Sequence, residues 1–126
     1  MLNRPARAVC ALLLLTTAAH AQPSTSRGQI SVAQVRAMLD QAATNPSARQ
    51  ALTAYLAGAG ETAGWLLDAG RDRGVLRAPC KRSLSLDADQ ARAAIAGASG
   101  TAPTDTPATP LIVSDMLKRA GCDPAK

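Results

Sequence analysis

Only a few side chains in this sequence could carry out nucleophilic, acid–base or metal chemistry. The chain has one histidine, His20, and three cysteines, Cys10, Cys80 and Cys122. A serine or cysteine nucleophile ordinarily needs a histidine base, and an ordinary zinc site needs histidine or several cysteines. The available chemistry therefore depends on whether the N-terminal stretch that contains His20 and Cys10 is kept.

The first 21 residues have the three parts of a cleaved signal peptide. Arg4 and Arg7 form a short positive region, and an apolar core follows over residues 8–19. Small residues then mark a cleavage site between Ala21 and Gln22. A retained membrane anchor is the alternative, and it is disfavoured because the apolar core is shorter than the ~20 residues needed to span a bilayer. We therefore predict export to the periplasm, with no membrane attachment after cleavage.

Cleavage would remove both His20 and Cys10 from the mature chain. The remaining 105 residues have 12 basic and nine acidic side chains. Without histidine, Ser/His and Cys/His catalysis and ordinary zinc sites are excluded, so we predict no enzyme activity, no metal and no cofactor. Two cysteines in an oxidising compartment favour a structural disulfide between Cys80 and Cys122, the alternative being a free reactive pair.

The hydrophobic core of the mature chain is expected to be modest. The sequence has no phenylalanine, and its only large aromatic side chains are Tyr55 and Trp65. Alanine supplies much of the apolar content, and it favours helix while burying little area per residue. A crosslink between Cys80 and Cys122 would contribute ~4 kcal/mol on the chain-entropy estimate, a large share of the ~5–15 kcal/mol typical of a domain.

Apolar spacing predicts an all-α fold, a single domain over residues 30–122 between a disordered leader at 22–29 and a polar tail at 123–126. The first helix is predicted to begin at the N-cap Ser31, with Gln34 completing a capping box, and to end near Ala43. Its apolar face consists of Val32, Val35, Met38, Leu39 and Ala42.

The second predicted helix begins at Asn45 and Pro46, continues to about Ala69 and ends at Gly70. Three glycines lie inside it, and each costs ~1 kcal/mol relative to alanine. Either they weaken the helix or they allow a neighbouring helix to approach closely, and the unbroken periodicity favours close approach. The glycines are Gly58, Gly60 and Gly64, and the apolar stripe consists of Leu52, Tyr55, Leu56, Ala59, Ala63, Leu66 and Leu67.

Two shorter helices are predicted in the last third of the chain. Ser85 or Asp87 caps the third, which ends at Gly97 and carries Ala88, Ala91, Ala94 and Ile95 on one face. After a flexible loop at 97–109, Thr109 caps the fourth helix, with Pro110 at its first position and Gly121 at its end. The predicted buried face of the fourth helix consists of Leu111, Val113, Met116, Leu117 and Ala120.

The segment 71–82 carries five positive charges and one negative charge. A nucleic-acid site is disfavoured, because the protein is exported and aromatic residues for stacking are absent. A solvated basic turn is favoured, and a contact surface for an acidic protein partner is the alternative. The candidate contact residues in this segment are Arg71, Arg73 and Arg77.

Two further features are candidates for partner binding. Trp65 is of a type enriched at binding hot spots, although a core position among the alanines is the favoured interpretation. The loop at 97–109, which contains Asp105, is of a kind that often carries recognition on a rigid scaffold.

The order of motifs resembles the Rap1a/Tai family of type VI secretion immunity proteins. The resemblance rests on the signal peptide, the helix containing Tyr55-Leu-Ala-Gly58, the Pro79-Cys80 pair, the short capped helix and the final helix that ends at Cys122. Leu52 stands where many members have another cysteine. The resemblance implies a small helical periplasmic protein that binds and inhibits a peptidoglycan amidase effector.

Two functional hypotheses follow. The first is an immunity protein that inhibits such an amidase through a binding surface. The second is a periplasmic structural or chaperone-like protein without enzymatic activity, with only nine acidic residues and no mature histidine to supply a pH switch. Homodimer formation is compatible with both hypotheses.

Overall fold

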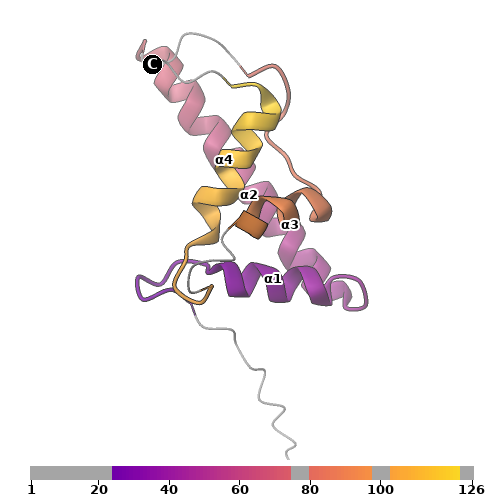
Figure 1. The fold of residues 1–126 in the computed structure, drawn as a ribbon. Coiled ribbons are helices and arrows are strands. Elements are labelled where there is room, and N and C mark those ends of the chain that lie inside the picture. Colours follow the sequence, from indigo (N-terminus) through magenta and orange to yellow (C-terminus); the bar gives the residue numbers. More distant parts are fainter. Residues whose placement is uncertain (1–23, 75–79, 98–102, 123–126) are drawn as a thin grey trace, which may run out of the picture.

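The computed structural model describes residues 24–74, 80–97 and 103–122. These residues form four helices, α1 (Val32–Gln41), α2 (Pro46–Asp72), α3 (Ala88–Ala96) and α4 (Ala108–Ala120) (Figure 1). Within the described part of the chain there is no strand, and one isolated bridge joins Ser31 to Pro107. The predicted all-α fold is confirmed. The predicted signal peptide and tail lie outside the described residues.

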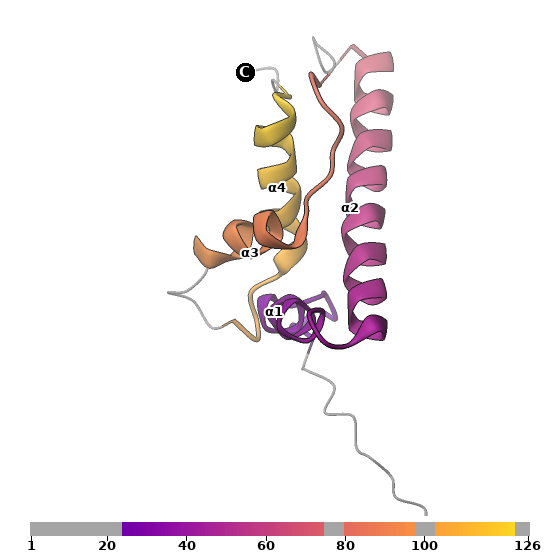
Figure 2. The same ribbon diagram turned by 90° about the vertical axis from the view of Figure 1, so that its right-hand side faces the viewer.

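The two longest helices, α2 and α4, run in the same direction, so both end at the same end of the molecule (Figures 1 and 2). Helix α1 lies across the opposite end, and α3 packs against α4 and α1. An extended segment at residues 81–87 passes between α2 and α4 (Figure 2). The core therefore lies where α1, α3 and this segment meet the α2–α4 pair.

Local capping explains where three of the helices begin. Ser31 and Gln34 form a reciprocal capping box at α1, and Asp87 and Gln90 form another at α3. Asn45 accepts two backbone N–H groups at the start of α2. Each cap satisfies donors that a helix start leaves without an intrahelical partner. The predicted caps Ser31 and Asn45 are confirmed, and of the two candidates for the third helix the cap is Asp87.

Helix α2 is longer than predicted. Gly70 does not end it, and the helix continues to Asp72 with Arg73 as its C-cap. The chain leaves the helical direction at Gly74, whose φ of 72° is in the left-handed region that glycine tolerates. Gly70 has no such φ, so it is an interior glycine and the predicted end was three residues early.

Helix α4 begins earlier than predicted, at Ala108 with Pro107 as N-cap and no side-chain cap. Tertiary contact takes the place of a side-chain cap, because the Ala108 N–H donates to the carbonyl of Ile30 at 2.9 Å. Thr109 therefore lies inside the first turn. Its predicted capping role is wrong, and its hydroxyl contacts Tyr55 at 3.1 Å instead.

Residues 24–29, predicted to be disordered, form a hydrogen-bonded turn. The Gly28 N–H donates to the Thr25 carbonyl at 2.8 Å, and the Thr25 hydroxyl accepts the Gln29 N–H. Residues 103–107 are also fixed, since their carbonyls accept the N–H groups of Val32 and Ala33. Thus the described half of the predicted flexible loop is attached to the start of α1, while residues 98–102 lie outside the described residues.

The core consists of aliphatic residues from all four helices and the extended segment. The largest fully buried side chains include Ile95, Ile112 and Met116. Ile112 was absent from the predicted face of the fourth helix, whereas Val113 and Leu117, which were included, are only partly buried. The buried stripe of α4 is rotated toward Ala108, Ile112, Met116 and Ala120.

The glycines of α2 have different roles. A Cβ at Gly60 would lie 2.2 Å from the carbonyl oxygen of Leu84, so close approach does require glycine there. The neighbour is the extended segment and not another helix. At Gly58 a Cβ would meet nothing within 4 Å, so the close-approach explanation is wrong at that position. At Gly64 a Cβ would make only an ordinary 3.8 Å contact with Leu84.

The predicted disulfide between Cys80 and Cys122 is present, with Cα atoms 4.2 Å apart. Beside it, the N–H groups of Lys81 and Arg82 both donate to the carbonyl of Ala120, at 2.8 and 3.1 Å. Gly121, with φ of 64°, makes the left-handed turn that brings Cys122 into place. The crosslink therefore joins the start of the extended segment to the end of α4.

Candidate functional site

A groove of about 680 Å³ lies between α2 and α4 in the described part of the chain. It is lined almost entirely by apolar groups, and small residues predominate on the α2 side. Because small side chains leave the helix backbone accessible, a partner could approach α2 closely there. These small residues are Ala54, Gly58, Ala59, Thr62 and Ala63.

The other wall comes from α4. Thr109, Val113 and Leu117 recur every four residues, which places them on one face of that helix. Leu66 and Leu67 of α2 complete the lining. The predicted apolar stripes of α2 and α4 do come together, but the parts that meet here form an open groove and not a closed core.

A polar contact marks the end of the groove nearer α1. The Tyr55 hydroxyl lies 3.1 Å from the Thr109 hydroxyl, and either oxygen could be the donor. Burial raises the pKa of Tyr55 above its ordinary value of 10.0, and the hydrogen bond to Thr109 opposes that shift. Tyr55 is therefore a neutral, half-buried group, and it joins the two walls.

Two large apolar side chains are exposed here: Trp65 on α2, and Leu66, which follows it and lines the groove. Their relative exposures are 69% and 57%, and Ile30, at 37%, is the only other exposed large hydrophobic residue in the described part of the chain. The favoured prediction that Trp65 is a core residue is wrong. Trp65 follows Gly58 by seven residues, close to two helical turns, so the two residues lie on the same side of α2. This leaves two adjacent large apolar side chains accessible to a partner.

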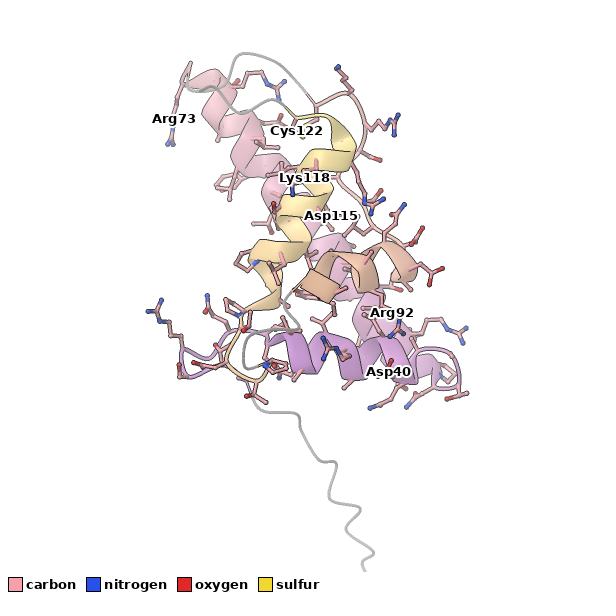
Figure 3. All side chains as sticks on the ribbon, in the orientation of Figure 1. Asp40, Arg73, Arg92, Asp115, Lys118 and Cys122 are labelled. Carbon is pink, nitrogen blue, oxygen red and sulfur yellow. A yellow bond between two sulfur atoms is a disulfide. The ribbon has the colours of Figure 1, made fainter. Side chains whose placement is uncertain are left out.

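Basic side chains gather at the disulfide end of the molecule, where Figure 3 shows Arg73, Lys118 and Cys122. Arg71 pairs with Asp68, and Arg119 pairs with Asp115. At this end of the molecule, four exposed cations form no ion pair with another described residue, and we call them the basic cluster. The basic cluster consists of Arg73, Lys81, Arg82 and Lys118.

The remaining predicted contact residues are not gathered at one place. The Asp105 carboxylate accepts the backbone N–H of Ser26 at 2.8 Å, and this hydrogen bond lowers the pKa of the exposed carboxyl group. This contact lies beside the start of α1, whereas Arg71 and Arg73 lie at the far end of α2. Arg77 lies outside the described residues. The structure thus brings Trp65, Arg71 and Arg73 onto one helix and separates Asp105 from them.

A second groove, of about 500 Å³, lies where α1, α2 and α3 meet. Its lining includes Arg49 and Arg92. Both side chains are already engaged, because Arg49 donates to the carbonyls of Ala42 and Ala43, and Arg92 pairs with Asp40 at 2.8 Å. Figure 3 shows the Asp40–Arg92 pair between α1 and α3. We interpret these contacts as structural.

The described residues contain no group of three or more histidine, cysteine or acidic side chains placed to hold a metal ion. None of the helices in this part of the chain is long and apolar enough to span a membrane. Comparison with protein-family models, with curated proteins and with solved structures found no match.

Proposed function

We propose that this chain is an exported inhibitor that binds a protein partner through the α2–α4 groove, and that the partner is a peptidoglycan amidase delivered by a type VI secretion system. The observation that carries the proposal is the apolar groove, with Leu66 exposed in its lining and Trp65 exposed next to Leu66 on α2. Burying a large apolar side chain contributes ~1.5–3 kcal/mol, and tryptophan is enriched among binding hot spots. These two residues are therefore the expected anchors of the interface.

The class of partner rests on the family resemblance. Two residues of the resembling helix motif, Tyr55 and Gly58, line the groove. The disulfide between Cys80 and Cys122 holds the extended segment against the end of α4. Two of the motif residues thus lie in the proposed interface, which supports an inhibitory role of the kind that the resemblance implies.

The proposal is tested by a lysis-protection assay with a matched pair of variants. We expect the neighbouring gene to encode a small cysteine–histidine amidase whose export to the periplasm lyses cells, and co-expression of this chain to prevent lysis. Gly58→Lys places a charge in the groove, and the added Cβ meets nothing within 4 Å. It should abolish protection, whereas Ala93→Lys on the exposed side of α3 should not. A neighbouring gene of another type, or full protection by Gly58→Lys, would contradict the proposal.

The second candidate function is a chaperone-like role. The same accessible Trp65 and Leu66 favour it, since exposed apolar surface also binds unfolded chains. This function predicts that the mature chain suppresses aggregation of unrelated unfolded proteins. An immunity protein is expected to leave that aggregation unchanged and to protect against one amidase only.

A further inference from the structure

Charge is unevenly distributed between the two ends of the molecule. The disulfide end, where α2 and α4 both terminate, comprises residues 68–74, 80–82 and 115–122 (Figure 2). It has six basic and three acidic side chains, whereas the other described residues have four basic and five acidic side chains. The disulfide end therefore has a net charge of +3 at neutral pH, and the rest of the described chain has a net charge of −1.

The acidic side chains at the disulfide end leave most of the basic cluster uncompensated. Asp68 and Asp115 each pair with an arginine of their own helix, and neither pair includes a member of the basic cluster. Asp72 is exposed and directly precedes Arg73, so it offsets one of the four cations. A surplus of three positive charges remains.

Backbone contacts hold three of these cations at the end of α4. Lys118 is in the last turn of that helix, and the N–H groups of Lys81 and Arg82 both donate to the carbonyl of Ala120. The side-chain carbons of Lys81 lie 3.3–3.6 Å from where a Cβ on Gly121 would be, so its stem packs against this turn. The disulfide joins the same two segments. Cations from distant parts of the sequence are thus gathered on one surface.

The stability of the helices accounts for only part of this arrangement. A cation at the C-terminal end of a helix interacts favourably with the partial negative charge there. Arg73 and Lys118, at the ends of α2 and α4, have such positions. Lys81 and Arg82 lie outside the helices, and both side chains are exposed. Their charges are therefore available to an external anionic group.

The residue types at the disulfide end favour a lipid surface over a protein surface. The centre of a protein interface is usually formed by apolar and aromatic side chains. The exposed large hydrophobic residues of the described chain are Ile30, Trp65 and Leu66, and all three lie outside the disulfide end. A layer of anionic headgroups requires only cations that reach it, and each lysine or arginine near such a layer strengthens binding about fivefold.

We propose that the disulfide end binds reversibly to a bilayer of anionic phospholipids through the basic cluster. The side chains of Arg73, Lys81, Arg82 and Lys118 contact the headgroups, and no helix enters the hydrocarbon. This peripheral contact differs from a retained membrane anchor, and it departs from the sequence-based expectation of no membrane attachment. None of these four residues lines the α2–α4 groove, so the proposal is independent of the proposed inhibition of an amidase.

Cosedimentation of the oxidised mature chain with vesicles tests the proposal. Vesicles made of equal parts phosphatidylglycerol and phosphatidylcholine are compared with vesicles of phosphatidylcholine alone. At low salt, three surplus charges predict that half of the chain is bound at about 5–10 mM accessible anionic-vesicle lipid. High salt should abolish this binding. Absence of binding at low salt, or equal binding to both kinds of vesicle, would overturn the proposal.

A matched pair of double variants tests whether the position of the charges matters. Lys81→Gln/Lys118→Gln removes two cations from the disulfide end and should weaken vesicle binding about 25-fold. Arg27→Gln/Arg36→Gln removes the same net charge near α1 and should change the binding less than about twofold. Circular dichroism checks that both variants retain their helices. Equal losses in the two variants would show that net charge alone governs binding, which would contradict the assigned surface.

Two further measurements separate this proposal from its alternatives. Trp65 is the only tryptophan of the chain and lies outside the disulfide end, so its emission should stay unchanged on the vesicles. A shift of that emission to shorter wavelength would place the groove side of α2 on the membrane and would overturn the proposal. A labelled polyglutamate peptide represents an acidic protein partner. Binding of this peptide with no binding to the anionic vesicles would assign the basic cluster to such a partner instead.

Discussion

At the scale of single residues, the neighbours of each side chain decide its role more than its type does. Gly58 and Gly60 are two residues apart on one helix, yet a Cβ has open space at Gly58 and would strike the Leu84 carbonyl at Gly60. Trp65 was expected in the core and is exposed, because α4 and the extended segment cover other sides of α2. Sequence spacing alone does not show which side of an apolar helix will be covered.

Alanine substitutions at Gly58 and Gly60 should have opposite effects on the free energy of unfolding. Gly58→Ala should stabilise the fold by about 0.5–1 kcal/mol, since alanine is the better helix former and meets no obstacle. Gly60→Ala should destabilise it by about 1–3 kcal/mol, because the backbone of the extended segment must move. Urea unfolding of both variants measures the two changes. Equal changes in stability would contradict the described contact with Leu84.

The raised pKa of Tyr55 leads us to predict that the free energy of unfolding falls at high pH. Its pKa is raised in the folded chain, so ionisation is easier in the unfolded state than in the folded state. The resulting stability is fully present below the ordinary pKa of 10.0 and is lost as pH rises through the folded pKa. Urea unfolding between neutral and strongly alkaline pH should show this loss, and Tyr55→Phe should lack it. Phenolate absorbance of the folded chain should appear only above the ordinary range.

At the scale of elements, the helix starts that side chains control were predictable from sequence. The caps Ser31, Asn45 and Asp87 are local signals, and they operate as expected. The start of α4 was not predictable, because the partner of the Ala108 N–H is the distant carbonyl of Ile30. Likewise, the groove depends on how far α2 and α4 are separated, which no local pattern specifies.

The register of α4 can be tested with two adjacent residues. Ile112 is fully buried, so Ile112→Ala should cost about 2–5 kcal/mol of unfolding free energy. Val113 is only partly buried at the groove, so Val113→Ala should cost much less and should weaken partner binding instead. Thermal melts and binding assays of the two variants provide the comparison. A larger stability loss in the Val113 variant would show that Val113, and not Ile112, faces the core.

At the scale of the whole molecule, one crosslink supports an alanine-rich core. The buried cluster contains leucine, isoleucine, valine and methionine, but no aromatic residue is fully buried in the described part of the chain. The disulfide and the hydrogen bonds from Lys81 and Arg82 to Ala120 hold the extended segment between α2 and α4. The fold class and this disulfide were predicted from the sequence, because helical periodicity and cysteine count are global signals.

Loss of the crosslink should therefore lower the melting temperature strongly. Closing the loop from Cys80 to Cys122 contributes ~4 kcal/mol on the chain-entropy estimate. For a domain of this size, each kcal/mol corresponds to about 4 °C or more, so Cys122→Ser should lower the melting temperature by about 15 °C or more. Reduction of the unmodified chain should have the same effect. A melting temperature that is unchanged by reduction would show that the helices need no crosslink.

The central proposal is that a partner amidase covers the groove between α2 and α4. Fluorine NMR of the mature chain labelled with fluorotryptophan tests it most directly, because Trp65 is the only tryptophan and is exposed in the free chain. We predict one fluorine resonance with the chemical shift of a solvent-exposed indole. When the amidase is added, this chemical shift should change to that of a buried indole, and in Gly58→Lys it should not change. An unchanged Trp65 resonance in a complex that inhibits the amidase would contradict the claim.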